Sequence, residues 1–287
     1  MTNPVVLVVG SLHYDIMVDT DTLPRRDETA IGSRWYPKFG GKGGNQAVAS
    51  AKAGVSTRMV GAVGRDDFGR FLRKHLRAGG VDDRFVLEVD AAGSGMSVAI
   101  TDRAGDYAAT IVSGANLLIP AAMLREAALW ADISVLVMQN EVPEAINIEA
   151  ARLSRARGIR TLLNAAPFRA LAPELCALVD VLVVNAVEAE QMGATEVLTL
   201  AHAQEAARSL GARFPVVIVT AGAEGLALRT ETGDLLSIPA QSIKAVSSHG
   251  AGDVFVGTLA ARLAQGAGVE AASHAASATA ARHVAGL

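Results

Sequence analysis

Short apolar runs alternate with longer runs rich in alanine and leucine along most of the chain. The short runs are almost continuously apolar, as expected of strands that are buried on both faces of a parallel sheet. The longer runs have the length and composition of helices. The pattern therefore predicts a layered α/β sandwich with crossover connections. The predicted strands are residues 5–9, 133–138, 161–164, 181–184 and 216–220, and the predicted helices are residues 144–157, 201–210, 251–265 and 270–284.

Two regions, residues 15–37 and 95–113, break this rhythm with shorter, alternating patterns. In the second region, residues 97–102 and 107–112 read as strands, and the stretch between them has the composition of a hairpin turn. Neither region is large enough to fold alone. We therefore expect one domain over residues 1–287, with a mostly parallel central sheet and a small discontinuous β lid over one edge. Ordinary surface hairpins are the alternative interpretation.

Composition narrows the class of protein. Of the 287 residues, 51% are hydrophobic and 19% are charged, so the chain can bury a substantial core and is globular. A net charge of −3 offers no basic stripe of the kind that nucleic-acid binding requires. The single cysteine, Cys176, excludes a disulfide framework and a cysteine-based zinc site.

The N-terminal residues and the hydropathy pattern bear on location. Residues 1–4 lack the basic region of a signal peptide, and the apolar run at 5–9 is too short for one. No segment approaches the roughly 18 uninterrupted apolar residues of a membrane span. We expect a soluble cytoplasmic protein without a membrane or nucleic-acid partner.

The glycine-rich segment Phe39-Gly-Gly-Lys-Gly-Gly-Asn-Gln46 comes directly before an alanine-rich helical pattern. Glycine loses more backbone freedom on folding than any other residue, so this cluster implies either an unusual backbone or the close approach of another group. A P-loop needs serine or threonine directly after its Gly-Lys pair and another glycine five residues before that pair's glycine. Here Lys42 is followed by Gly43 and position 36 is tyrosine, so the segment is not a P-loop. The dinucleotide fingerprint fails here and again at Gly250, which disfavours a dehydrogenase.

A second glycine-rich segment, His249-Gly-Ala-Gly-Asp253, leads directly into an apolar helical run. Backbone N–H groups at a helix N-terminus have no partner in the helix, and together with the helix dipole they attract anions. An N-cap aspartate is the simplest explanation of Asp253, but the preceding glycines would be costly for capping alone. We therefore expect Gly250, Ala251 and Gly252 to hold a phosphoryl group while Asp253 accepts a hydroxyl proton. The segment at 40–44 would contact a small polar substrate, with hydrogen bonds from Lys42 and Asn45.

The two glycine-rich segments resemble the pair of signatures of the ribokinase family, the PfkB-type carbohydrate kinases. The resemblance extends over nearly the whole chain. Each motif alone is moderately specific, but the motifs follow one another in the order found in the family, which makes the resemblance very specific. It includes Gly10-Ser11, Asp15, Gly114-Ala-Asn116, Met138-Gln-Asn-Glu141, Asn164-Ala-Ala-Pro167, Asn185-Ala-Val-Glu188 and Thr220-Ala-Gly-Ala-Glu-Gly225.

The resemblance implies a ribokinase-like three-layer fold and phosphoryl transfer from ATP to a sugar hydroxyl, with Mg²⁺ as cofactor. Asp253 resembles the general base, and residues 250–252 resemble the anion hole. Glu188 matches the acidic residue that orders magnesium. In relatives two lids pair across a dimer, so the resemblance also implies a homodimer through the lid. The sugar-contacting positions are His13, Asp15, Gly41, Lys42, Asn45 and Glu141, and the nucleotide-contacting positions are Asn185, Thr220, Gly222, Gly225 and Ser277.

The chain departs from the family pattern at three places. Ser247-Ser248-His249 replaces an Asp-Thr-Thr whose aspartate helps to hold a monovalent cation. The chain also lacks most of the C-terminal segment that commonly flanks the cation and the adenine. We therefore expect weak or absent activation by K⁺. The third departure is His13, which stands where a sugar-contacting asparagine is expected and which affects the choice of sugar.

Three functions are compatible with these residues. The first is phosphorylation of ribose or a ribose-like sugar. The second is phosphorylation of a nucleoside or another small sugar by an enzyme of the same family. The third is a sugar- or nucleotide-binding protein with impaired catalysis, against which the retention of Asp253, Gly252 and the segment at 40–45 argues.

Overall fold

A large mixed sheet forms the centre of the protein in this computed structural model, which describes residues 3–287. Met1 and Thr2, part of the N-terminal segment assessed for a signal peptide, lie outside the described residues. Seven neighbouring strands run parallel, and two more are added at one edge, each by antiparallel pairing with its neighbour. In spatial order they are β13 (Leu235–Pro239), β12 (Gly225–Arg229), β11 (Val216–Thr220), β10 (Val181–Asn185), β9 (Arg160–Asn164), β8 (Ile133–Gln139), β1 (Val5–Val9), β4 (Ser56–Gly64) and β5 (Val81–Val89).

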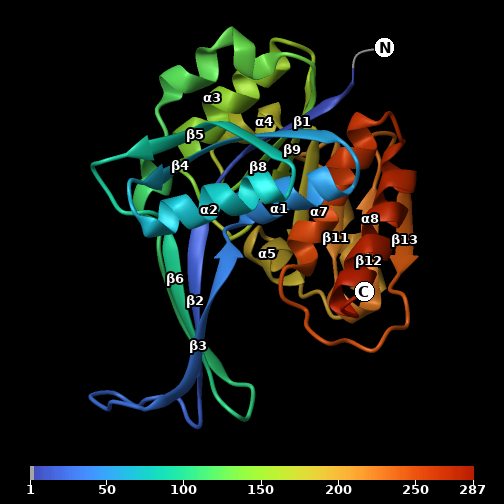
Figure 1. The fold of residues 1–287 in the computed structure, drawn as a ribbon. Coiled ribbons are helices and arrows are strands. Elements are labelled where there is room, and N and C mark those ends of the chain that lie inside the picture. Colours follow the sequence, from blue (N-terminus) through green and yellow to red (C-terminus); the bar gives the residue numbers. More distant parts are fainter. Residues whose placement is uncertain (1–2) are drawn as a thin grey trace.

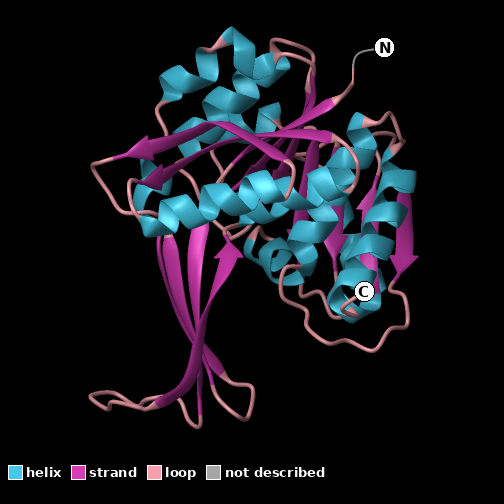
Figure 2. Cartoon of the chain, viewed as in Figure 1, coloured by secondary structure: helices cyan, strands magenta, loops and turns pink. Residues whose placement is uncertain are grey.

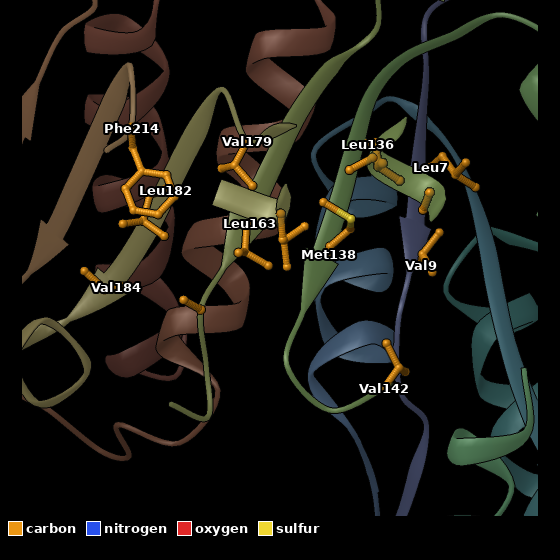
Figure 3. Packing of buried hydrophobic residues seen from close by; sticks show 14 of the residues in the cluster. Leu7, Val9, Leu136, Met138, Val142, Leu163, Val179, Leu182, Val184 and Phe214 are labelled. Carbon is orange, nitrogen blue, oxygen red and sulfur yellow. The ribbon is translucent and has the colours of Figure 1, made fainter. Parts of the chain in front are cut away.

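Both faces of this sheet are covered by helices, which gives three layers (Figures 1 and 2). Side chains of one strand alternate between two separate cores: Leu7 and Val9 pack into one, and Val6 and Val8 into the other. Figure 3 shows the first core along β1, β8, β9 and β10. This core is covered by α3 (Glu144–Arg155), α4 (Pro173–Leu178), α5 (Ala186–Gln191) and α6 (Leu200–Leu210), and the other by α1 (Lys42–Lys52), α2 (Asp67–Ala78), α7 (Ala251–Ala264) and α8 (Val269–Val284).

The strands predicted from continuous apolar runs are present with nearly the predicted bounds, and so are the four predicted helices. The prediction missed β4, β5, β12 and β13. β4 contains glycines and the buried Arg58, whose guanidinium donates to the carbonyl oxygens of Ala128 and Leu129. β5 is an edge strand whose apolar residues are interrupted by the charged run Asp82-Asp83-Arg84 and by Glu88. β4 and β5 therefore lack the continuous apolar run that identified the others.

A second, smaller sheet has the strand order β3-β2-β6-β7 and is formed by two separate stretches of chain. We call it the lid sheet. It extends away from the body of the molecule as a narrow twisted arm (Figure 1). The first of these stretches covers residues 13–40, so it begins two residues before the predicted region 15–37 and ends three residues after it. Its strands are β2 (His13–Thr20), β3 (Gly32–Gly40), β6 (Met96–Thr101) and β7 (Tyr107–Val112).

Hydrogen bonds fix the lid sheet to the body where the chain passes between them. Asn116, just after β7, donates to the carbonyl oxygen of Leu12 and accepts from its N–H, both at 2.9 Å. Asp66, the N-cap of α2, accepts from the N–H and the hydroxyl of Ser94, just before β6. A half-buried carboxylate and a buried amide thus hold the base of the lid sheet in register with β1 and β4.

None of the helices within residues 3–287 is both long and apolar enough to cross a bilayer.

Candidate active site

A cavity of about 200 Å³ opens at the carboxyl ends of β9, β10 and β11, beside the N-terminus of α7. The carboxyl edge of a parallel sheet is where ligands bind in open α/β folds. Residues from α1, α5, α7 and the strand ends meet in this cavity. The lining residues are Lys42, Asn164, Ala166, Val183, Val184, Asn185, Glu188, Thr220, Gly250, Gly252, Asp253, Phe255 and Val256.

The N-terminus of α7 faces this cavity. Gly250, its N-cap, has a φ of 80°, in the left-handed region that favours glycine. A Cβ atom at Gly252 would meet nothing within 4 Å, so the backbone there is open to a ligand. The N–H of Ala251 instead donates to the carbonyl oxygen of Ser248 at 3.2 Å. The anion hole predicted at residues 250–252 is therefore open at Gly252, whereas the N–H of Ala251 is already engaged.

Asp253 is only 9% exposed and its carboxylate accepts two side-chain hydrogen bonds. Oδ1 accepts from Nε2 of Gln46 at 2.9 Å, and Oδ2 accepts from Nδ2 of Asn45 at 3.1 Å. Burial raises the pKa of the Asp253 carboxyl to about 6, against the opposing effect of the Lys42 charge and the two amide donors. Such a group is ionised at neutral pH yet basic enough to accept a proton.

Lys42 and Glu141 meet at the start of α1. The Glu141 carboxylate accepts from the backbone N–H of Lys42 at 2.8 Å and from the hydroxyl of Ser11. A carboxylate in this position is stabilised by the helix dipole and satisfies one of the free N–H groups of the first turn. Glu141, predicted as a sugar contact, is thus also the acidic cap of the helix that carries Lys42 and Asn45.

The glycines of the first glycine-rich segment make close contacts with protein atoms. Gly41, the N-cap of α1, has a φ of 84°, and a Cβ there would lie 2.7 Å from the backbone nitrogen of His13. A Cβ at Gly43 would lie 2.5 Å from the backbone nitrogen of Ser11, and one at Gly44 would clash with the ring of Phe39. The expectation that a ligand explains the whole segment is therefore wrong for Gly43 and Gly44, whose lack of side chains allows α1 to pack against the chain after β1.

The base of the lid sheet supplies the other predicted sugar contacts. Asp15 accepts from the hydroxyl of Ser97 at 2.5 Å, and burial raises the pKa of its carboxyl. Lys38 stands opposite Asp15 on the neighbouring strand. His13 is buried, and within residues 3–287 its Nε2 has no hydrogen-bond partner. Asp15 and His13 thus lie at the foot of the lid sheet, where the chain leaves the body.

At the other side of the cavity, Asn185 and Glu188 form a capping box at the start of α5. The Asn185 side chain accepts from the Glu188 N–H, and the Glu188 carboxylate accepts from the Asn185 N–H, both at 2.9 Å. Burial raises the pKa of the Glu188 carboxyl. Thr220 ends β11 and lines the cavity, and Gly222 follows in a short turn with open space around its Cα. Asn185, Glu188 and Thr220 therefore converge on the same cavity as Asp253.

Three predicted nucleotide contacts, Gly222, Gly225 and Ser277, are not among the residues that line the cavity. A Cβ at Gly225 would lie 2.1 Å from the carbonyl oxygen of Ile238, so this glycine is explained by the pairing of β12 with β13. Ser277 is half-buried on α8, which packs along α7. Conversely, the sequence interpretation assigned no role to Gln46 or Asn164, which meet beside Asp253. The sequence did contain a signal for each of them: Gln46 is a polar residue in an alanine-rich helix, and Asn164 is the last residue of a buried strand.

The donor set fits a magnesium ion that is held partly by phosphate. Within the described residues, no three or more His, Cys, Asp or Glu side chains cluster as a metal site. Mg²⁺ is commonly bound by one or two carboxylates together with substrate phosphates and water. Glu188 lines the cavity with a carboxylate oxygen donor of the kind that Mg²⁺ prefers.

Comparison with known proteins gives a consistent result. Residues 3–285 match the model of the pfkB family of carbohydrate kinases. The ribokinase of Mus musculus is 35% identical over 263 residues, which cover 90% of this chain and 81% of that protein. The deoxyribokinase of Salmonella typhi is 32% identical over 270 residues, covering 93% and 88%. The Arabidopsis thaliana ribokinase, solved with ribose and ATP, superposes with a TM-score of 0.90 at 27% identity, over 99% of this chain and 93% of that one.

These similarities confirm the predicted ribokinase-like fold as well as the resemblance that the motifs indicated. The chain therefore belongs to the pfkB family of carbohydrate kinases and is an ATP-dependent sugar kinase.

Proposed function

We propose that this kinase transfers the γ-phosphoryl group of ATP to a hydroxyl group of ribose or a closely related pentose. The observation that carries the proposal is the position of Asp253. Its buried carboxylate lies at the N-terminus of a long helix, in a cavity that also contains Lys42, Glu188 and Thr220. Relatives named ribokinase and deoxyribokinase, at 28–35% identity, support a pentose as the acceptor.

In this mechanism the substrate hydroxyl lies against the Asp253 carboxylate, which accepts its proton as the oxygen attacks the γ-phosphorus. The open backbone at Gly252 and the positive end of the α7 dipole stabilise the charge on the transferring group. Lys42, which also lines the cavity, contributes a positive charge. Phosphoryl transfer depends mainly on such positioning and charge neutralisation.

The two substrates would approach from opposite sides. On the lid side, Asp15, Gly41, Lys42, Asn45 and Glu141 would bind the sugar hydroxyls, with His13 beside them. On the sheet side, Asn185, Thr220 and Gly222 would contact the nucleotide. Gly225 would shape the turn that presents Gly222, and Ser277 would approach the nucleotide from α8. When bound, Mg²⁺ neutralises phosphate charge, and Glu188 would hold it.

The first prediction concerns Asp253→Asn. We expect kcat to fall by at least about 10²-fold, because a general base contributes roughly that factor or more. Asparagine keeps an acceptor oxygen for Gln46, so the dissociation constant for ATP should change little. The wild-type kcat should fall as pH drops through about 6, because the base works only when ionised. Near-normal turnover by the variant would show that another group is the base.

The second prediction concerns the cations. Glu188→Gln removes the charge but keeps an acceptor for the capping box. We expect the Mg²⁺ concentration needed for half-maximal activity to rise about tenfold or more, with little change in thermal stability.

Ser247 offers no carboxylate for a monovalent cation, so replacing K⁺ by tetramethylammonium should change the wild-type kcat less than about twofold. A large dependence on K⁺ would mean that backbone carbonyl groups form a cation site without a carboxylate.

The third prediction is a homodimer that forms through the lid sheet. Trp35 is 64% exposed and Ile111 is 59% exposed, and every residue of β7 is exposed. Exposed apolar strands of this kind are a liability unless they are covered. We expect a dimer in sedimentation velocity, converted to a monomer by Ile111→Asp but not by Leu198→Asp, which alters an exposed apolar residue outside the lid sheet. A monomeric wild-type protein at assay concentrations would exclude this assembly.

The fourth prediction tests the substrate class by ADP release across pentoses, deoxypentoses, hexoses and nucleosides. A pentose should give the highest kcat/KM. A nucleoside with the highest value would instead favour a nucleoside kinase. Binding of sugar or ATP without ADP release would indicate a binding protein with impaired catalysis.

His13 gives this panel a matched variant. Neutral histidine offers one donor and one acceptor at different ring atoms, whereas asparagine reaches a single hydroxyl with both. A pocket built for one hydroxyl rejects analogues that leave its buried groups unpaired. We expect His13→Asn to raise kcat/KM for ribose relative to the preferred sugar. If ribose is already the best substrate and the ranking stays unchanged, His13 does not set specificity.

A further inference from the structure

A chain of three buried polar side chains leads from β8 through α1 to Asp253. Nε2 of Gln139 donates to Oε1 of Gln46 at 2.7 Å, and Nε2 of Gln46 donates to Oδ1 of Asp253 at 2.9 Å. The same Nε2 also donates to Oδ1 of Asn164 at 3.0 Å. Gln46 and Gln139 are both 0% exposed.

Every hydrogen-bonding group of the Gln46 amide is used, and this fixes its orientation. If the amide were flipped, its oxygen would face the acceptor oxygens of Asp253 and Asn164, and Gln139 could accept from it only by turning its own amide, whose oxygen has no other partner within residues 3–287. Leaving buried polar groups mismatched costs on the order of 1–3 kcal/mol each. Gln46 therefore always presents an N–H to Oδ1 of Asp253.

The two oxygens of Asp253 have different surroundings. Oδ1 faces the sealed interior through Gln46, whereas Oδ2 faces Asn45, which is only partly buried. A substrate in the cavity therefore reaches Oδ2 more readily than Oδ1. The charged groups near the carboxylate are Lys42 on α1 and Glu141 after β8, and Glu188 on α5 lines the same cavity.

The close approach of α1 and α7 sets this geometry. A Cβ at Gly257 would lie 2.4 Å from the carbonyl oxygen of Gln46, so only glycine allows the two helices to come this close. Gln46 and Asp253 therefore lie opposite each other at a helix crossing whose distance is fixed by packing.

We propose that Gln46, held by Gln139, is the positioning residue of the catalytic base: it keeps Oδ1 of Asp253 as a hydrogen-bond acceptor and leaves Oδ2 to take the substrate proton. In the transfer step the substrate O–H bond breaks and its proton goes to Oδ2. The substrate oxygen then bonds to the γ-phosphorus, and the bond from that phosphorus to ADP breaks. This inference rests on the proposed function.

The test compares the pH dependence of kcat for Gln46→Met with that of the wild type. Methionine has a similar length but donates no hydrogen bond. The Gln46 donor lowers the pKa of the Asp253 carboxyl, so its loss raises that pKa further. We expect the acidic limb of the kcat profile to move up by roughly one pH unit or more and kcat at pH 7 to fall about 10- to 100-fold. The KM for ATP should change less than about twofold.

Two further variants separate positioning from a general loss of structure. Gln139→Met leaves Gln46 in place but removes the hydrogen bond that Gln139 donates to it. The acidic limb of the kcat profile of this variant should therefore lie between those of the wild type and Gln46→Met. Thr258→Val removes a buried hydroxyl of α7 that has no hydrogen-bond partner within residues 3–287, and it should leave the profile unchanged.

Each remaining outcome tells against one claim. A Gln46→Met enzyme with the wild-type acidic limb and kcat would overturn the positioning role, and so would a Gln139→Met profile that matches the wild type. If kcat per folded molecule falls equally for Thr258→Val, the effect is structural and the inference is wrong. If the wild type itself releases no ADP with any sugar, the proposed function fails, whatever the variants show.

Discussion

The burial of one carboxylate, Asp253, is the constraint on which the site depends. A carboxylate removed from water is costly unless hydrogen bonds or opposite charges compensate. Here the compensation comes from the positive end of the α7 dipole, two side-chain amides and the charge of Lys42. The remaining cost appears as a carboxyl pKa of about 6. The same desolvation that makes this group expensive to bury also makes it a better proton acceptor.

This arrangement requires two helices from distant parts of the chain to cross closely. α1 carries the amides and α7 carries the carboxylate, and Gly257 at the crossing leaves no side chain between them. The start of α1 is itself fixed by Glu141 and by glycines that pack against the chain after β1. The lid sheet begins at the same place, because β2 starts at His13 and β3 ends at Gly40. One junction therefore links Asp253, the side of the cavity at Lys42 and the lid sheet.

The sequence predicted the parts of this fold whose signals are local. The strands at 5–9 and 216–220 were found because both of their faces are buried, which leaves an uninterrupted apolar run. β4 and β5 were missed because glycines, a buried arginine and edge charges interrupt that run. Asp253 could be selected as a candidate because its glycines and its helix are adjacent in sequence.

The partners of Asp253 could not be found in this way. Gln46 is 207 residues from Asp253 and 93 residues from Gln139, so no local pattern connects them. The glycines at 43 and 44 were attributed to a ligand, whereas close helix packing explains them. Likewise, Gly225 matches the position of a nucleotide-contacting glycine in the family motif, but the close approach of the neighbouring strand β13 explains why this residue is glycine. A glycine in a sequence indicates close approach, and only the fold shows what approaches.

A crystal structure with ribose and a non-hydrolysable ATP analogue tests the central claim most directly. The account predicts a sugar hydroxyl within about 3.2 Å of Oδ2 of Asp253. It also predicts that the terminal phosphate lies over the backbone of Gly252 and that Oδ1 is still bonded to Gln46. A hydroxyl bound to Oδ1, or a terminal phosphate placed away from the N-terminus of α7, would contradict it.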